Sequence, residues 1–237
     1  MLKLSKTAIV IPIKKFDKSK TRLSPFLDVK ERKELTELLL LDTLEKTHKL
    51  KNTQIIIVSG EVIKLADKFN DVVIINEHNS NGVNNAIALT NKFIENNEFS
   101  ESIIIPIDLP LLSTKDLKDM IKFSRKFKNG ICIVPSHRYD GTNILLRKPN
   151  LIIETFYDNN SFYNHIKAAT KKRKVIKIFN IENLMIDLDT IEDIETIINI
   201  YDTAYHDNTI KNKIKESRSI DFLKVIMKNK SINCGNK

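Results

Sequence analysis

The chain has 237 residues, of which 41% are hydrophobic, so it is long enough to bury the core of one globular domain. It contains no run of about 18 apolar residues, and its first six residues lead into a strand pattern rather than a secretion signal. We therefore expect a cytoplasmic protein that does not bind membranes. Its two cysteines, Cys132 and Cys234, support neither a disulfide framework nor a thiolate metal site.

The formal net charge is +9, and its distribution argues against a nucleic-acid partner. The tail from residue 205 carries eight Lys and Arg against three Asp and Glu, and residues 14–22 carry five cations against one Asp. The rest of the chain is nearly neutral. Because no zinc-finger spacing or RNA-recognition motif accompanies the charge, a non-catalytic nucleic-acid-binding protein is kept only as an alternative.

Apolar runs alternate with helix-period segments along most of the chain, which is typical of an α/β fold with a mostly parallel sheet. The folded domain is expected over residues 1–204, and a basic C-terminal extension, partly helical or disordered, over 205–237. The predicted strands cover residues 7–13, 54–59, 72–75, 103–108, 131–134, 144–146, 174–178 and 185–188. The predicted helices begin near Asp28, at residues 61 and 83, after Ser113, at Ser161 as the cap, and at residue 191, with a short amphipathic helix at 220–227.

Phosphate binding in this chain must depend on side chains. Glycine occurs only at positions 60, 82, 130, 141 and 235, so neither the dinucleotide motif G-x-G-x-x-G nor the P-loop can be present. Five cations follow the first predicted strand and can bind phosphate, unless the segment is a solvated surface loop. They are Lys14, Lys15, Lys18, Lys20 and Arg22.

Carboxylates follow two other predicted strands. Asp108 ends the fourth strand, and Asp187 and Asp189 end a later one. The carboxyl ends of parallel strands share one edge of a sheet, where two carboxylates can hold Mg²⁺ together with water and phosphate. Each has a simpler interpretation, because Asp108 can form a turn and Asp189 or Thr190 can cap a helix.

An ordered set of motifs spans residues 7–201: IPIK at 11–14 with TRLSP at 21–25, GVNNA at 82–86, PIDLPLL at 106–112, DGTN at 140–143, SF-x-x-H at 161–165 and DLDT at 187–190. This set resembles the 2-phospho-L-lactate guanylyltransferase family. The resemblance implies a three-layer, Rossmann-like nucleotidyltransferase fold of the GT-A-like type with a mostly parallel central sheet. It also implies transfer of GMP from GTP to 2-phospho-L-lactate, or to a related phospho-acid such as phosphoenolpyruvate, in biosynthesis of the deazaflavin coenzyme F(420).

The resemblance also implies roles for the charged residues. Asp108 is implied as the first ligand of Mg²⁺, and Asp187 or Asp189 as the second, with Asp187 preferred. The implied catalytic residues are Asp108, Lys14, Lys20 and Arg22. The three cations among them are implied to approach the nucleotide phosphates.

The polar loops receive roles in the same way. Gly82 and Asn84 match a turn near the nucleotide base, where an Asn amide offers a donor and an acceptor to guanine. The backbone amides of Thr142 and Ser161 match a cradle for the carboxylate of the acid substrate.

One loop departs from the family pattern. Relatives often have Phe-Gly-x-Gly-Ser where this chain has Asp158 and Asn160 in place of the glycines. Asn and Asp tolerate left-handed backbone better than other non-glycine residues, so we expect the loop to keep its shape. Asp158 adds negative charge near an anionic substrate and leaves the natural acid open.

The implied reaction needs no general base, because the phosphate of the acid is already deprotonated at neutral pH and attacks the α-phosphorus of GTP directly. His165 is therefore interpreted as a helix-face residue, with a substrate contact left open. The expected partners are GTP and a small phosphorylated hydroxy or enol acid, and a homodimer is left open. The enzyme alternatives are a sugar-phosphate or molybdopterin-type nucleotidyltransferase of the same fold, which usually has a glycine-rich first loop.

Overall fold

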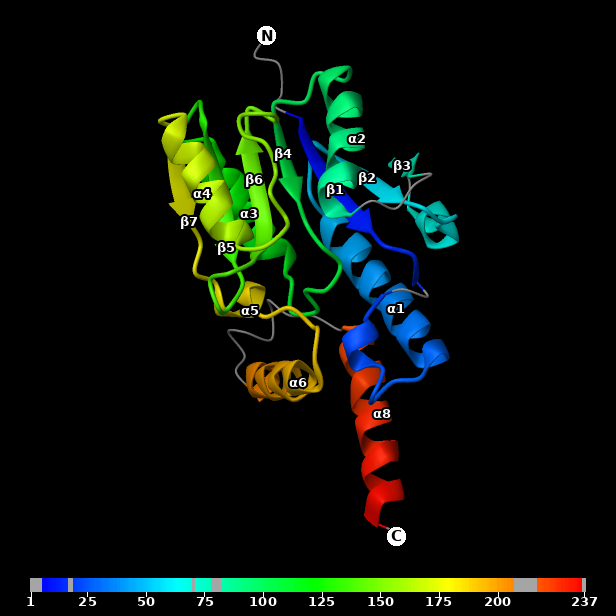
Figure 1. The fold of residues 1–237 in the computed structure, drawn as a ribbon. Coiled ribbons are helices and arrows are strands. Elements are labelled where there is room, and N and C mark those ends of the chain that lie inside the picture. The colour runs from blue at the N-terminus through cyan, green and yellow to red at the C-terminus, as the bar shows by residue number, and fades with distance from the viewer. Residues whose placement is uncertain (1–5, 17–18, 70, 78–81, 207–216, 236–237) are drawn as a thin grey trace.

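The computed structural model describes residues 6–16, 19–69, 71–77, 82–206 and 217–235 (Figure 1). Lys18, one of the five cations predicted to bind phosphate, lies outside these ranges, as do residues 207–216 of the C-terminal extension. Among the described residues, no helix is both long enough and apolar enough to cross a membrane.

Seven strands in the described part of the chain form one sheet, in the order β3-β2-β1-β4-β6-β5-β7. The sheet is mostly parallel, because only β6 runs antiparallel to its neighbours β4 and β5. The predicted α/β class with a mostly parallel sheet is confirmed. The strands are β1 (Thr7–Ile13), β2 (Thr53–Ser59), β3 (Val72–Asn76), β4 (Glu101–Ile104), β5 (Gly130–Pro135), β6 (Thr142–Lys148) and β7 (Val175–Ile178).

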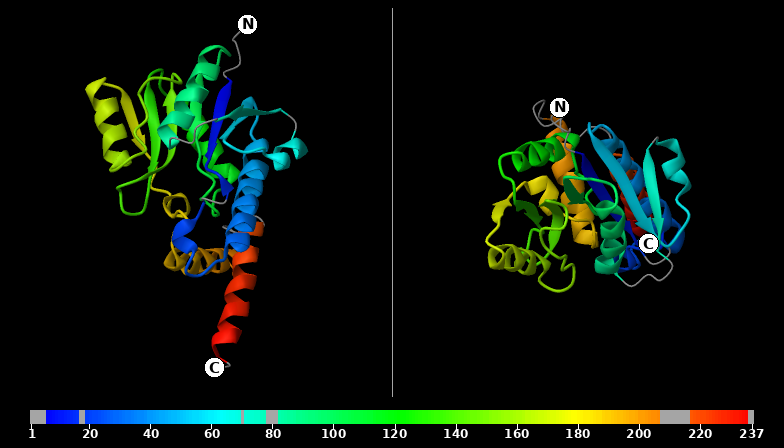
Figure 2. Two further views of the ribbon diagram at one scale, coloured as in Figure 1. Left: turned by 45° about the vertical axis from the view of Figure 1, so that its right-hand side comes forward. Right: turned by 90° about the horizontal axis from the view of Figure 1, so that it is seen from above.

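Helices on both faces of the sheet make three layers (Figures 1 and 2). On one face, α2 (Val83–Glu95) and α4 (Ser161–Lys171) share a core with Val10 of β1 and Leu145 of β6. On the other face, α1 (Val29–His48) and α3 (Thr114–Ser124) pack against Ile9 and Ile11 of β1. The predicted three-layer arrangement is therefore confirmed.

The starts of α1 and α3 agree with the predicted starts near Asp28 and after Ser113, and a side chain caps each helix. Asp28 accepts a hydrogen bond from the backbone of Glu31, whose side chain accepts one from the backbone of Asp28. Ser113 accepts one from the backbone of Asp116 and caps α3. These bonds satisfy N–H groups that have no partner within a helix.

The fourth strand is shorter than predicted. It ends at Ile104 rather than at Asp108, although the N–H of Ile105 still donates to the oxygen of Val10 at 2.9 Å. Pro106 has no N–H and cannot continue the ladder, so Asp108 lies on the loop beyond the sheet. The short strand predicted at 144–146 is instead extended at both ends, over Thr142–Lys148.

Three further local predictions differ from the structure. Residues 185–188 form no strand, because α5 (Glu182–Met185) ends there and Leu188 bonds to the loop at Asp108 instead of to a neighbouring strand. The short helix predicted at residues 61–69 begins later than expected and is the 3-10 helix η3 (Lys64–Lys68). Ser161 is the first residue of α4 and not its cap, which is Asn160.

The C-terminal extension contains a helix that packs on the domain. The helix α8 (Arg218–Gly235) runs beside α1 and away from the sheet, while α6 (Ile191–His206) crosses below the sheet in the view of Figure 1. Ile220 and Leu223 of α8 are buried in the same core as α1. That residues 1–204 form the functional domain, with 205–237 as an extension, stays a prediction.

Candidate active site

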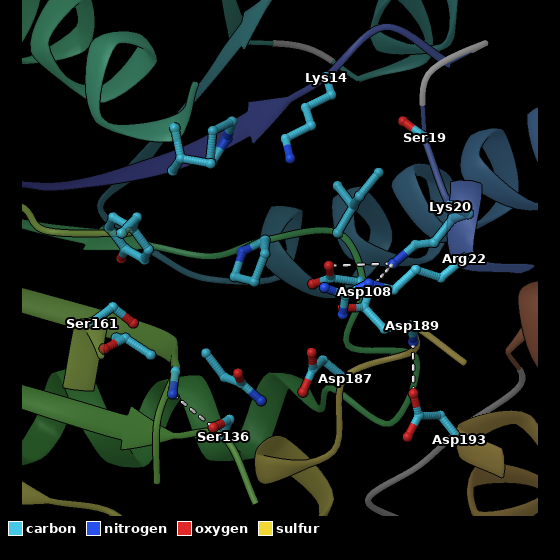
Figure 3. A pocket seen from close by; sticks show the side chains of 18 of the residues that line it. Lys14, Ser19, Lys20, Arg22, Asp108, Ser136, Ser161, Asp187, Asp189 and Asp193 are labelled. Atoms are coloured by element: carbon cyan, nitrogen blue, oxygen red, sulfur yellow. Dashed lines mark hydrogen bonds and ion pairs between the residues drawn. The ribbon is translucent and has the colours of Figure 1, made fainter. Parts of the chain in front are cut away.

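A cavity of about 690 Å³ opens at the edge of the sheet where β1 and β4 end (Figure 3). Its wall combines the loop after β1, the loop after β4, the turn before β6, the start of α4 and the segment before α6. The topology thus brings together the motifs that lie far apart in the sequence. The predicted site residues that line the cavity are Lys14, Lys20, Arg22, Asp108, Thr142, Ser161, Asp187 and Asp189.

Lys20 connects the basic loop to both acidic segments. Its Nζ lies 3.3 Å from Oδ2 of Asp108 and 3.4 Å from Oδ1 of Asp189, and it donates to the backbone oxygen of Leu188 at 2.5 Å. The side chain is only 7% exposed. Lys20 is therefore not a solvated surface lysine, and its ion pairs with the more exposed Asp108 and Asp189 are partly shielded from water.

The backbone at Lys20 has a φ of 54°, in the left-handed region, and the 3-10 helix η2 (Thr21–Leu23) follows it. Arg22 lies on this helix with its side chain 73% exposed, and its NH1 is 3.5 Å from Oδ2 of Asp189. Lys14 enters the cavity from the end of β1 (Figure 3). The loop thus presents a buried ammonium and two accessible cations to the same space.

Asp108 and Asp187 face this space from two loops that a backbone bond joins. The N–H of Leu188 donates to the oxygen of Asp108 at 2.9 Å. Burial, and then the negative charges of Asp108 and Asp189, raise the pKa of Asp187 to about 6, while the charge of Lys20 opposes the rise. The carboxylates are crowded, and an additional positive charge would relieve their repulsion.

This pair fits a magnesium ion. Among the described residues, no three His, Cys, Asp or Glu side chains gather as a metal site of their own. Mg²⁺ needs only one or two protein carboxylates, because water and substrate phosphates fill its other positions. Asp108 with Asp187 or Asp189 satisfies that need, and the binding of Mg²⁺ stays a prediction.

Asp193 is a cavity residue that the sequence reading missed. Its Oδ2 accepts hydrogen bonds from the N–H groups of Asp189 and Thr190, at 2.9 and 2.7 Å, and Thr190 Oγ1 accepts from the N–H of Asp193 at 3.4 Å. Thr190 thus caps α6, as predicted from its position before the helix. The carboxylate of Asp189 takes no part in this cap and faces Lys20. The spacing T-x-x-D was the signal that could have identified Asp193.

The turn before β6 forms another wall. Ser136 Oγ accepts from the N–H of Gly141 at 2.9 Å and donates to Oδ1 of Asp140 at 2.7 Å, which fixes the turn (Figure 3). His137 and Arg138 at its tip also line the cavity and were missed, because no motif marks them. The turn leads directly into Thr142, the first residue of β6.

His165 is a buried structural group next to this wall. Its Nε2 accepts from the N–H of Phe156 at 2.9 Å, so Nδ1 carries the proton and donates to Oγ1 of Thr142 at 3.0 Å. Burial, followed by the positive charge of Arg147, lowers the pKa of His165 to about 3. The imidazole is therefore neutral at physiological pH, and it ties Thr142 to the loop before α4.

The loop before α4 has the left-handed backbone at one of the two positions where the family pattern has glycine. Asn160 has a φ of 56°, the left-handed conformation expected for this position. Asp158 has a partner within the chain, because its Oδ2 accepts from Nδ2 of Asn84 at 3.0 Å. Asn84 Oδ1 in turn accepts from the N–H of Tyr157 at 2.9 Å. The predicted base contact of Asn84 thus competes with two bonds that hold this loop.

A second cavity, of about 280 Å³, adjoins the first on the side of β2 and β3. Gly82 lines it, and the two cavities share Pro12, Ile13, Lys14 and Val83. Gly82, predicted near the nucleotide base, and Lys14, predicted at its phosphates, therefore lie on one continuous wall, whereas Asn84 lines neither cavity.

The chain is similar to known guanylyltransferases over most of its length. Residues 7–227 match the family model described as guanylyl transferase CofC like. The 2-phospho-L-lactate guanylyltransferase of Methanocaldococcus fervens is 33% identical over 206 residues, which cover 86% of this chain and 89% of that protein. The enzyme of the same name from Methanocaldococcus jannaschii is 34% identical over 209 residues, which cover 87% and 89%.

Solved structures show the same fold at low sequence identity. A protein assigned to the nucleotide-diphospho-sugar transferases, from Desulfovibrio desulfuricans G20, matches with a TM-score of 0.71 and 13% identity, covering 95% of this chain and 98% of that one. A cytidylyltransferase from Leptospira borgpetersenii matches with a TM-score of 0.55 and 17% identity, covering 96% of each chain. The fold is therefore that of the nucleotidyltransferases.

Proposed function

Because the chain belongs to the CofC-like guanylyl transferase family, we propose that it joins GMP from GTP to 2-phospho-L-lactate, or to a related phospho-acid, and releases pyrophosphate. The observation that carries the proposal is the buried ammonium of Lys20 between Asp108 and Asp189, in the cavity that Lys14 and Arg22 of the same loop also line. The product belongs to the biosynthesis of the deazaflavin coenzyme that the sequence resemblance implied.

The reaction forms one bond and breaks one bond at the α-phosphorus of GTP. An oxygen of the acid's phosphate attacks the α-phosphorus of GTP, and the bond from that phosphorus to the bridging oxygen of the β-phosphate breaks. Pyrophosphate leaves with the electron pair, and no proton has to be taken from the nucleophile. The protein therefore contributes orientation and neutralisation of charge.

The cations of the basic loop supply much of that neutralisation. Lys14, Lys20 and Arg22 enter the cavity from the β1 side and would bind the nucleotide phosphates and the developing pyrophosphate. Asp108 and Asp187 would hold Mg²⁺, which when bound supplies further positive charge at the phosphoryl oxygens. Asp189 pairs with both Lys20 and Arg22 and so orients the two cations.

The acid substrate would bind at the opposite wall. The backbone N–H of Ser161 belongs to the first turn of α4, where N–H groups without helical partners favour an anion. Thr142 adds a second amide, held in place by the neutral ring of His165. Because these contacts come from the backbone, they suit 2-phospho-L-lactate, phosphoenolpyruvate and phosphoglycerate alike, and the choice among them is a matter for experiment.

The test is an assay of the purified protein with GTP, Mg²⁺ and each acid in turn. We expect acid-dependent release of pyrophosphate and a guanylylated product of the matching mass. A sugar 1-phosphate serves as the competing acceptor and CTP as the competing donor. Turnover with the sugar phosphate alone would identify a different nucleotidyltransferase. The cytoplasmic location, the absence of a nucleic-acid partner and a homodimer stay predictions.

A further inference from the structure

The smaller cavity contains a buried acidic side chain that the proposed chemistry leaves unused. Glu77 follows β3 directly, and its backbone N–H donates to the oxygen of Ser59, the last residue of β2, at 2.8 Å. The residue is 6% exposed, and its Oε1 has no hydrogen-bond partner among the described residues. A buried acceptor without a donor costs free energy, so this atom calls for a ligand that donates.

The strand order places Glu77 where the base of a bound nucleotide would lie. Along the edge of the sheet that forms the site, Glu77 follows β3, Lys14 follows β1, Asp108 follows β4, and Thr142 begins the antiparallel β6. Phosphates bound between Lys14 and Asp108 leave two directions for the rest of the nucleotide. The predicted acid site at Thr142 takes one of them, so the base points toward β2 and β3.

The lining of the smaller cavity suits a flat purine ring. Pro12, Ile13, Val83 and Ala86 provide apolar surface on the wall that leads from the larger cavity. Gly82 has a φ of 92°, which favours glycine, and a Cβ placed there would meet no heavy atom of the described residues within 4 Å. Among the described lining residues Glu77 is the one carboxylate, beside the cations Lys14 and Lys15, and such a group can set the specificity of an otherwise apolar pocket.

We propose that the carboxylate of Glu77 accepts hydrogen bonds from N1–H and the N2 amino group of guanine and thereby selects GTP. This inference rests on the proposed function, because it assumes that the nucleotide donor occupies the two cavities. An ionised carboxylate only accepts hydrogen bonds, and guanine presents two adjacent donors on this edge. Adenine presents an acceptor at N1 and would leave Glu77 unpaired.

Asn84 is the rival for this role. Its amide oxygen and nitrogen are bonded to Tyr157 and Asp158, so reading guanine would require it to release the loop before α4. Glu77 has an unpaired atom and lines the cavity, whereas the contacts of Asn84 make it a positioning residue for that loop.

The decisive variant is Glu77→Gln, tested by calorimetric binding of nucleotides in the presence of Mg²⁺ and without any acid, so that no turnover occurs. The amide oxygen of Gln can accept a hydrogen bond from N1–H of guanine. Its NH₂ group then faces the N2 amino group, and two donors cannot bond to each other. The NH₂ group can instead donate to the C2 oxygen of xanthosine triphosphate. We expect E77Q to bind GTP about 100-fold more weakly and to bind xanthosine triphosphate at least about 10-fold more tightly than the unmodified protein does.

Inosine triphosphate and ATP complete the series. Inosine triphosphate lacks the N2 amino group, so the unmodified protein should bind it about 10-fold more weakly than GTP, and E77Q should lose that discrimination. ATP should bind more weakly still to the unmodified protein. Glu95→Gln is the matched control, since Glu95 is an exposed residue at the end of α2 that lines neither cavity. A melting curve of each variant shows whether it is folded.

The outcomes separate this inference from the proposed function. A gain of xanthosine triphosphate binding supports the role of Glu77, because structural damage cannot create a new preference. Unchanged GTP binding by folded E77Q overturns the inference, even where guanylyl transfer proceeds. Equal binding of GTP and ATP by the unmodified protein overturns it as well. If the base preference switches but no phospho-acid is guanylylated, the inference holds and the proposed acceptor is wrong.

Discussion

Lys20 and Asp108 are 88 residues apart in the chain, and Nζ of the first lies 3.3 Å from Oδ2 of the second. The parallel pairing of β1 with β4 explains this contact, because it brings the loops after both strands to one edge of the sheet. This partly buried ion pair balances a carboxylate that is also the predicted first ligand of the metal. Lys20 and Asp108 should therefore be coupled in function as well as in space.

Replacing Asp108 with Asn should reduce kcat by about 100-fold or more, equivalent to ~3 kcal/mol of lost charge stabilisation. The amide keeps the shape of the side chain and loses the charge that holds the metal. Steady-state kinetics at saturating Mg²⁺ would measure the loss. Asp119→Asn is the control, because that carboxylate is half exposed and pairs with Lys115 on the same helix, away from the cavity. Equal activities of the two variants would contradict the assignment of Asp108.

The two cations of the basic loop should differ in effect. Lys20→Ala removes a buried ammonium that contacts Asp108 and Asp189, so we expect a drop in kcat of about 100-fold. Arg22→Ala removes a cation that is 73% exposed and should mainly raise the KM for GTP, by about 10-fold or less. Initial rates over a range of GTP concentrations separate the two effects. If the double variant keeps normal kinetics, the loop takes no part in the reaction.

Much of this site could be predicted from the sequence, because its motifs follow strands whose edge is set by parallel pairing. Asp108 and Lys20 were identified in this way, whereas Asp187 was assigned to the end of a strand that the structure does not form. The end of β4 was not predicted correctly, since the apolar run continues to Ile107 while Pro106 removes a donor that the ladder needs. Residues 185–188 have the alternation of a strand, but their backbone partner is a loop. Local patterning does not reveal which partner a segment finds.

Glu77 could not be predicted from the sequence for a different reason. It follows a strand, and its neighbours in the chain form no motif, so only the packed structure reveals that the carboxylate is buried beside a cavity. Asn84 shows the converse. Its residue type suggested a guanine contact, whereas its bonds to Tyr157 and Asp158 depend on a loop that is distant in the sequence.

Asp187→Asn should make the metal-free protein more stable and the enzyme inactive. The pKa of Asp187 is raised to about 6, so its charge is unfavourable in the folded state at pH 7. Removing that charge should increase the free energy of unfolding by about 1 to 3 kcal/mol. Urea denaturation without Mg²⁺ and an activity assay with Mg²⁺ test the two halves. Asp189→Asn breaks contacts to Lys20 and Arg22 and should not be stabilising. A gain in stability for that variant alone would make Asp189, and not Asp187, the preferred second metal ligand.

The neutral state of His165 predicts a pH dependence of stability. Its pKa is about 3 in the folded protein and near 6.5 when unfolded, so between these values the unfolded chain binds more protons. The contribution of His165 to the free energy of unfolding is fully present above pH 6.5. It decreases as the pH falls, by about 2 kcal/mol at pH 5. Urea denaturation at pH 7.5, 6 and 5 should show this loss in the unmodified protein. His165→Gln should have a shallower slope, and identical slopes would mean that the imidazole is not held neutral.

Truncation after residue 204 should cost stability without removing the chemistry. In the full chain the buried carboxylate of Asp42 accepts hydrogen bonds from Ser217 and Ser219, and Ile220 and Leu223 of α8 complete the core beside α1. The truncated protein leaves that carboxylate without these donors and exposes apolar surface, so we expect its free energy of unfolding to fall by at least about 3 kcal/mol.

The catalytic cavity should survive this truncation, because no residue in the described part of α8 lines it. We therefore expect the guanylyl transfer rate per folded molecule to stay within about twofold of the full chain, measured at a temperature where both proteins are folded by circular dichroism. Asp42→Asn in the full chain is the companion variant, since it weakens the attachment of α8 while the helix is still present. Light-scattering mass shows whether α8 also supports a dimer. An inactive truncated protein that is folded and has an unchanged oligomeric mass would mean that the extension acts on the site, and that the catalytic unit extends beyond residue 204.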